Sequence, residues 1–211
     1  MTADDIGRLF VVAAPSGAGK TSLLRAILKQ VPNAVFSISY TTRKKREQEK
    51  DDIDYRFVSH SEFQQMINDG CFLEHARVFD HYYGTASKEV DSLRRRQLDV
   101  ILEIDWQGAR QVREKIPDSA SIFILPPTRQ ALQSRLRGRS TDSDEVIKRR
   151  LADSVADMGH WDEFDYIVIN DDFDTGVNDL REIITGNGDR YRQNRPQFKA
   201  LIDRLLEPDV A

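Results

Sequence analysis

The chain has 211 residues, which is long for one domain and short for two, so we expect one core with inserted subdomains. Its 31 Lys and Arg residues against 35 Asp and Glu residues give a formal net charge of -4, which excludes a protein held on nucleic acid or on an acidic membrane by its overall field. With one cysteine, Cys71, no apolar run of about 18 residues and no basic leader, the sequence predicts a cytoplasmic protein without disulfides or a cysteine metal site.

Short apolar runs alternate with helical patterns along most of the chain. The runs are LFVVAA (9–14), AVFSISY (34–40), VILEI (100–104), SIFIL (121–125) and YIVIN (166–170). Helical patterns cover 21–30, 107–115, 129–136 and 144–158, and two more follow residue 174. This alternation predicts an α/β fold, a mostly parallel sheet flanked by helices.

Two segments interrupt the alternation. Residues 55–83 contain YRFVS, a short helix that begins near Ser61, and FLEHARVF, a combination that predicts a small inserted α+β subdomain. The segment GRSTDSDE (138–145) is polar and begins with glycine, so we expect a mobile loop there.

A glycine-rich segment, APSGAGKTS (14–22), follows the first strand and fits the P-loop pattern except for Ala14, which replaces the usual leading glycine. Backbone N–H groups of such a loop converge on phosphate oxygens, and the next helix directs its positive dipole end to the same anion. Lys20 is expected to reach the β and γ phosphates, and Thr21 to take one Mg²⁺ coordination position. The predicted nucleotide-binding residues are Ala14, Pro15, Ser16, Gly17, Ala18, Gly19, Lys20, Thr21 and Ser22.

An acidic residue, Asp105, ends the apolar run VILEI, at the carboxyl edge where open α/β sheets collect their ligands. An aspartate in this position also serves as a turn or helix cap, so a structural role is the alternative. The P-loop favours a functional role for Asp105.

Several motifs in the same order resemble those of the guanylate kinase family. They are SISYTTRKKR (37–46), Tyr55, FLEHA (72–76), YYGT (82–85), ILEIDWQG (101–108), RLRGRSTDSDEVIKRRL (135–151) and IVINDD (167–172). The resemblance covers nearly the whole chain and implies a P-loop NTPase fold with a core of 1–38, 96–136 and 159–211, a GMP-binding subdomain over 39–95 and a lid over 137–158. It also implies ATP-dependent phosphorylation of GMP, and of dGMP, to the diphosphate.

The resemblance assigns an acceptor site. Guanine donates hydrogen bonds from N1 and N2, so a carboxylate is the apt reader, and Glu74 matches that position. By similarity Asp105 assists at this edge, and Ser39 and Thr85 bind the O6 and N7 side. Forked guanidinium groups suit the acceptor phosphate. The implied phosphate ligands are Arg43 and Arg46, with the hydroxyls of Tyr55 and Tyr83.

The resemblance also assigns the phosphoryl-transfer residues. Arg135, Arg139 and Asn170 are assigned to ATP binding, and Arg150 is assigned to GMP binding. The implied catalytic set is Lys20, Arg43, Arg139, Arg150 and Asp105, with Mg²⁺ bound together with ATP. No general base is required, because the acceptor phosphate is already ionised at pH 7. We expect a monomer or homodimer without nucleic-acid or membrane partners.

The charged run RKKREQEKDD (43–52) is therefore interpreted as divided in function. Its outer cations, Arg43 and Arg46, bind phosphate, while the two inner lysines and the EQEKDD tail are expected to be largely solvent-facing. The family usually carries proline where Lys45 stands and glycine near Gln48 and Asp52, so we expect the backbone of this turn to be either rearranged or more mobile.

Two other functions remain open from the sequence. One is a guanylate-kinase-like scaffold module without catalysis, which the intact Gly19-Lys20-Thr21 and the full set of arginines disfavour. The other is a related P-loop kinase that acts on a different phosphorylated acceptor, such as a ribose bisphosphate; Glu74 and the TTR and YYGT motifs favour guanine instead.

Overall fold

The computed structural model describes residues 6–78, 80–138 and 144–207. By its contacts the chain divides into two units. The first unit contains the chain up to Val11 together with Asn33–Ala120, and the second contains Val12–Pro32 together with the chain from Ser121 onward. Within the described residues, no helix has the length and apolar character required to cross a membrane.

The larger sheet has five strands in the order β2-β7-β1-β8-β9. The strands are β1 (Leu9–Ala13), β2 (Ala34–Phe36), β7 (Asp99–Glu103), β8 (Ala120–Leu125) and β9 (Tyr166–Ile169). β2 pairs with β7 in parallel, and β8 pairs with β9 in parallel. All five residues of β1 are buried, as in parallel sheets covered on both faces. The predicted α/β fold class is confirmed.

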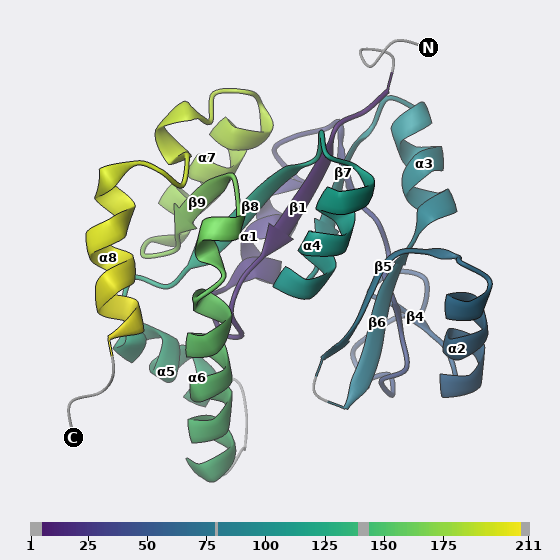
Figure 1. The fold of residues 1–211 in the computed structure, drawn as a ribbon, viewed down its shortest axis with the longest axis horizontal. Helices are drawn as coiled ribbons and strands as arrows, with labels where there is room; N and C mark the ends of the chain where they lie inside the picture. The colour runs from purple at the N-terminus through teal and green to yellow at the C-terminus, as the bar shows by residue number, and fades with distance from the viewer. Residues whose placement is uncertain (1–5, 79, 139–143, 208–211) are drawn as a thin grey trace. The chain divides into compact units, whose positions relative to one another are not determined.

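The first unit carries a second, four-stranded sheet in the order β4-β3-β6-β5 (Figure 1). Its strands are β3 (Tyr40–Thr41), β4 (Arg56–Phe57), β5 (Phe72–Val78) and β6 (His81–Ala86), and the helices of this unit are α2 (His60–Asn68), α3 (Ser87–Arg95) and α4 (Trp106–Lys115). β5 and β6 form an antiparallel hairpin with Glu74 opposite Thr85. α2 begins with a capping box, in which Ser59 and Glu62 satisfy each other's backbone N–H groups.

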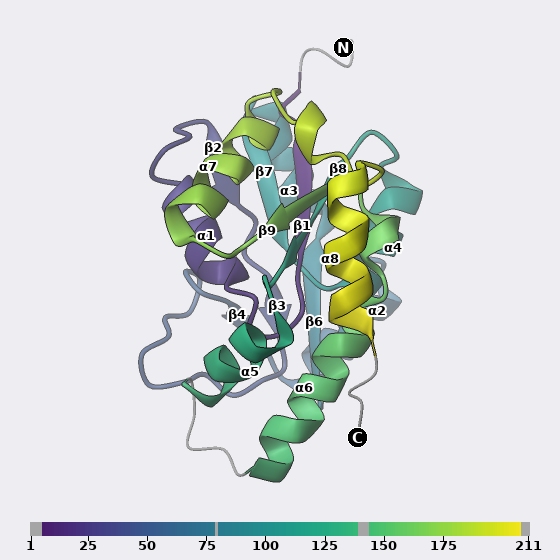
Figure 2. The same cartoon turned by 90° about the vertical axis from the view of Figure 1, so that its left-hand side faces the viewer.

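The second unit contains the remaining helices. They are α1 (Lys20–Ile27), α5 (Arg129–Arg137), α6 (Asp144–Met158), α7 (Phe173–Ile184) and α8 (Pro196–Leu206), with short 3₁₀ helices η2 (Trp161–Glu163) and η3 (Asp189–Tyr191). Figure 2 shows α1 and α7 side by side, in agreement with their close contact. Leu23 and Leu24 of α1 and Leu180 and Ile184 of α7 are all fully buried, so apolar packing accounts for this arrangement.

The predicted strand over 34–40 is wrong in extent. β2 ends at Phe36, and Tyr40 starts a strand of the other sheet. Between them the Ile38 N–H donates to the Glu89 carboxylate at 3.3 Å, so a side chain replaces a strand partner there. The predicted loop over 138–145 begins at Gly138, the C-cap of α5, and α6 already begins at Asp144. The expected mobility concerns residues 139–143, which lie outside the described residues.

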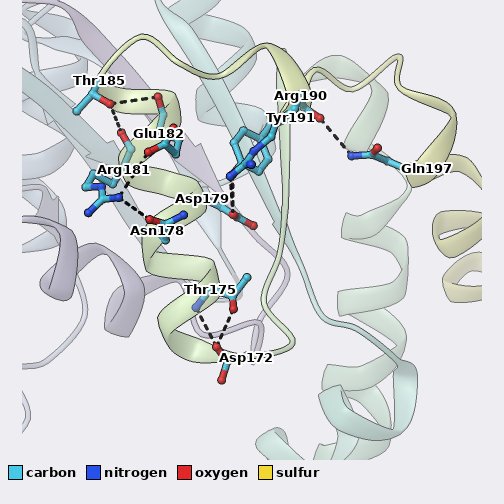
Figure 3. Close-up of polar contacts among 10 residues, drawn as sticks. All are labelled: Asp172, Thr175, Asn178, Asp179, Arg181, Glu182, Thr185, Arg190, Tyr191 and Gln197. Carbon is cyan, nitrogen blue, oxygen red and sulfur yellow. Dashed lines mark hydrogen bonds and ion pairs between the residues drawn. The ribbon is translucent and has the colours of Figure 1, made fainter.

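A polar pair fixes η3 against α7 (Figure 3). The Tyr191 hydroxyl donates to Asp179 Oδ1 at 2.6 Å, and Arg190 contacts both the Tyr191 hydroxyl and, at 3.9 Å, the Asp179 carboxylate. Burial raises the pKa of Tyr191 to about 12, so the phenol remains a donor at neutral pH. The hydrogen bond therefore joins a neutral donor to a charged acceptor, which is the stronger kind.

We predict that Tyr191→Phe lowers the free energy of unfolding by about 1–3 kcal/mol, because the ring is retained while the bond to Asp179 is lost. Urea unfolding at pH 7 of Tyr191→Phe, Asp179→Ala and the double variant measures the coupling directly. Additive effects of the two substitutions would contradict this interpretation.

Candidate active site

The loop between β1 and α1 adopts a conformation that requires glycine at two positions. Gly17 has φ of 89° and Gly19 has φ of 91°, both in the left-handed region that other residues rarely adopt. Gly19 is the N-cap of α1, and Lys20 and Thr21 form the first turn of that helix. The loop therefore places backbone N–H groups and the positive end of α1 together, which is the arrangement that binds phosphate.

Asn170, at the end of β9, supports this loop. Its side chain is buried, and Nδ2 donates to the Ala18 carbonyl at 2.6 Å. A Cβ atom on Gly19 would lie 2.3 Å from the same Nδ2 atom, so close contact with Asn170 is a second reason for glycine at this position. The predicted role of Asn170 in ATP binding, by direct contact with the base, stays a prediction, whereas its support of the loop is observed.

Two of the predicted arginines of the second unit lie against these elements. Arg135 Nη2 donates to the Asn170 carbonyl at 2.8 Å, and its Nη1 atom is buried without a hydrogen-bond partner among the described residues. A buried guanidinium nitrogen without an acceptor among the described residues is energetically costly. Arg150 Nη2 lies 3.3 Å from Ser16 Oγ in the loop. The third predicted arginine, Arg139, lies outside the described residues.

In the first unit, a buried carboxylate faces the β5–β6 hairpin. Glu74 is 2% exposed, and Thr85 Oγ1 donates to its Oε1 atom at 2.6 Å. Burial raises the pKa of Glu74 to about 7 and the nearby charge of Asp105 adds to the rise, although the Thr85 hydrogen bond opposes it. Two residues predicted for guanine, Glu74 and Thr85, are thus brought together, and a carboxylate with this pKa can accept hydrogen bonds near neutral pH.

Asp105 caps α4, as the structural alternative had suggested. Its Oδ1 atom accepts a hydrogen bond from the Gly108 N–H at 2.8 Å. Its carboxylate also influences Glu74 electrostatically, so it belongs to the same group of residues. Capping leaves the second carboxylate oxygen, Oδ2, near the Gln107 amide at 3.3 Å.

Arg43 is held by a residue that the sequence analysis placed in solvent. Glu49 binds both terminal nitrogens of Arg43, at 2.7 and 3.0 Å, and also accepts the Arg46 N–H at 2.8 Å. The Arg43 and Glu49 side chains are only 13% and 16% exposed, so the prediction that this tail is largely solvent-facing is wrong at Glu49. The pair lowers the pKa of Glu49 and raises that of Arg43, mainly through their mutual hydrogen bonds.

Aromatic rings surround Arg43. Its guanidinium lies 5.4 Å from the ring centre of Tyr55, and the rings of Tyr55 and Tyr83 meet edge to face at 5.9 Å. Burial raises the pKa of Tyr55 to about 12, which keeps its hydroxyl protonated as a donor. Three predicted phosphate ligands are therefore neighbours, whereas Arg46 is exposed at the surface of the same turn.

The turn that lacks two glycines retains a left-handed residue. Asp52 has φ of 58°, a conformation that aspartate tolerates better than most residues. Its carboxylate accepts from Arg56 Nε at 2.9 Å, and Arg56 N–H in turn donates to the Ser39 carbonyl. The turn is therefore connected to Ser39 through the backbone of β4.

A glycine loop with Lys-Thr at the start of a helix, behind a buried strand, defines a P-loop nucleotide-binding protein. The family model for guanylate kinase matches residues 6–187. The chain is 48% identical to guanylate kinase of Escherichia coli (strain K12) over 202 residues, 95% of this chain and 98% of that protein. It is 49% identical to guanylate kinase of Salmonella typhimurium over the same length. The chain belongs to the guanylate kinase family.

The fold agrees with this assignment. The crystal structure of guanylate kinase from Anaplasma phagocytophilum matches the chain with a TM-score of 0.71 at 27% identity, covering 97% of this chain and 98% of that one. The resemblance found in the sequence motifs is confirmed, and with it the P-loop fold.

The raised pKa of Glu74 predicts a pH-dependent stability. Between the ordinary value of 4.5 and the value of about 7, the folded protein binds more protons at this site than the unfolded chain does, so the free energy of unfolding falls as pH rises. Glutamine does not titrate, so in Glu74→Gln the free energy of unfolding no longer falls with pH through this site. From pH 5 to 8 the stability of Glu74→Gln relative to the native protein should increase by roughly 3 kcal/mol, at about 1.4 kcal/mol per pKa unit.

Urea unfolding at four pH values between 5 and 8 measures this difference. Glu62→Gln is the matched control, because Glu62 is exposed and its hydrogen bonds with Ser59 lower its pKa, which places its titration below this range. A difference between Glu74→Gln and the native protein that does not change with pH would show that Glu74 is already ionised at pH 5.

Proposed function

We propose that this protein transfers the γ-phosphoryl group of ATP to GMP, giving ADP and GDP. Membership of the guanylate kinase family supports the reaction, since the similarity covers nearly the whole chain. The single observation that supports GMP as the phosphoryl acceptor is the buried Glu74 carboxylate, which accepts a hydrogen bond from Thr85. We propose dGMP as a second acceptor, because the assigned contacts are made to the base and the phosphate.

Guanine recognition rests on hydrogen-bond complementarity. Ionised Glu74 accepts from N1–H and the N2 amino group of guanine, and Ser39 serves the O6 and N7 side. Thr85 joins Ser39 there when its single hydroxyl hydrogen turns from Glu74 to the base. Adenine presents an acceptor at N1 and no amino group at C2, which would leave the buried carboxylate unpaired. Sites of this kind reject the wrong base by about 10⁴-fold.

The phosphate groups are held by two kinds of donor. The loop around Gly17 and Gly19 and the side chain of Lys20 bind the triphosphate, and Arg43, Tyr55 and Tyr83 bind the acceptor phosphate. Arg135, whose buried Nη1 lacks a partner among the described residues, is proposed to neutralise charge on ATP. Arg139 is proposed for the same role from its motif. Arg150 is proposed to bind GMP and to act in catalysis.

Mg²⁺ fits the residues at the start of α1. Thr21 lies in the first turn of α1, beside the left-handed Gly19, where the phosphates of a bound nucleotide would meet it. Thr21 would supply the hydroxyl, and the ion would supply charge neutralisation at the phosphates.

Transfer requires positioning rather than a protein base. An oxygen of the ionised GMP phosphate forms a bond to the γ-phosphorus while the bond to the β–γ bridging oxygen breaks, and ADP leaves. Lys20 and the arginines stabilise the charge as it moves between these oxygens. We further propose that residues 39–95 form the GMP-binding subdomain and 137–158 the lid.

A coupled assay of ADP release tests the function. GMP and dGMP should be phosphorylated, AMP should be about 10⁴-fold poorer in kcat/KM, and ribose 1,5-bisphosphate should be inert. Turnover with the ribose compound would indicate the other kinase class, and no turnover with any acceptor would indicate a scaffold module.

Arg135 Nη1, which has no partner in the described parts of the chain, gives a further prediction. Arg135→Met should raise KM for ATP about tenfold or more, because a charged hydrogen bond worth about 1.5–3 kcal/mol is lost, and leave KM for GMP unchanged. Arg137→Met is the control, since Arg137 is exposed on the same helix. Equal effects of the two substitutions would remove Arg135 from the ATP site.

A further inference from the structure

One face of α4 holds the strand that carries Glu74. β5 lies at the edge of the four-stranded sheet, so the backbone groups on its outer side need partners other than a strand. Three α4 residues, Gly108, Gln111 and Lys115, are spaced three and four apart and therefore lie on one face of the helix. All three meet β5 between Phe72 and His75.

Gln111 acts as a substitute for a neighbouring strand. Its Nε2 atom donates to the His75 carbonyl at 2.8 Å, and its Oε1 atom accepts from the His75 N–H at 3.1 Å. One side-chain amide thus satisfies both backbone groups of a single β5 residue. Lys115 completes the contact by donating to the carbonyls of Leu73 at 2.6 Å and Phe72 at 3.3 Å.

Glu74 lies between these two anchored positions, and Gly108 faces its carboxylate. A Cβ atom at residue 108 would lie 2.5 Å from Glu74 Oε2 and 3.1 Å from its Cδ. The carboxylate is buried and its other oxygen is bound to Thr85, so any added atom must displace the group. Glycine is less favourable than alanine in a helix, and at position 108 the room it leaves for Glu74 is a physical reason for its presence.

We infer that Gly108, Gln111 and Lys115 form a positioning face on α4 that fixes the Glu74 carboxylate and thereby sets the preference for guanine. This inference rests on the proposed function, in which Glu74 reads N1 and N2 of the base. Gln111 and Lys115 fix the strand on either side of Glu74, and Gly108 fixes how closely its carboxylate approaches the helix. Each charged hydrogen bond to guanine that a displaced Glu74 carboxylate loses weakens binding by roughly 10- to 10²-fold.

Gly108→Ala is the direct test. KM for GMP should rise by roughly 10- to 10²-fold, while KM for ATP and kcat at saturating GMP change little. The preference for GMP over inosine monophosphate, which lacks the 2-amino group, should fall. Gln111→Ala should act in the same direction, and Glu114→Gln, an exposed residue of the same helix, is the matched control. A lower melting temperature with an unchanged GMP preference would assign these residues a merely structural role.

A double variant keeps the inference testable if Gly108→Ala folds poorly. Glu74→Asp shortens the side chain by one methylene, so Gly108→Ala should add little damage in the Glu74→Asp background if the clash acts through Glu74. Full additivity would overturn the inference.

Glu74→Ala separates the two proposals. If Glu74→Ala keeps the native preference for GMP over inosine monophosphate, the proposed reading of guanine by Glu74 fails. If Glu74→Ala loses that preference while Gly108→Ala and Gln111→Ala keep it, the inference about the positioning face is wrong, and the proposed reading of guanine by Glu74 still stands.

Discussion

A buried carboxylate requires hydrogen-bond donors and room from the residues around it, and in the first unit that carboxylate is Glu74. Removing its charge from water is unfavourable, as its pKa of about 7 indicates. The hydroxyl of Thr85, the glycine at position 108 and the anchoring of β5 by Gln111 and Lys115 all concern this one group. The buried Glu74 carboxylate lowers the stability of the folded protein but suits ligand recognition, a combination that is common at functional sites.

The second unit depends on a backbone conformation instead. Two left-handed glycines shape the loop, and the buried amide of Asn170 fixes it from β9. Arg135 is bound to the carbonyl of the same asparagine, so the loop, the strand end and α5 are joined through one residue. Phosphate binding by main-chain groups requires this rigidity, because the N–H groups must be directed at the ligand before it arrives.

The sequence predicted the elements whose signal is local. All five strands of the larger sheet and the helices over 107–115, 129–136 and 144–158 were located, because their apolar periodicity is continuous. β3 and β4 have two residues each, and strands this short are defined by their pairing with other strands and not by a sequence pattern. The sequence therefore carried no sign that the run 34–40 contains the start of a second strand. The helix α3 was not predicted.

The site was partly predictable for the same reason. The P-loop and Glu74 were found through motifs. Glu49 was assigned to solvent because its ion pair with Arg43 depends on the folded conformation of the turn. Gly108 carried a signal that was not used: an isolated glycine in a helical pattern indicates a close approach by another group. Asn170 was predicted as an ATP-binding residue, but its hydrogen bond to the Ala18 carbonyl joins residues far apart in the sequence and could not be predicted.

The left-handed conformation of Asp52 limits which residues can occupy this turn. β-Branched and bulky side chains are genuine outliers at positive φ, whereas glycine, asparagine and aspartate are accepted. Position 52 is thus open to few replacements although its side chain is exposed, and a surface position of this kind should tolerate far less sequence drift than its solvent accessibility alone would suggest.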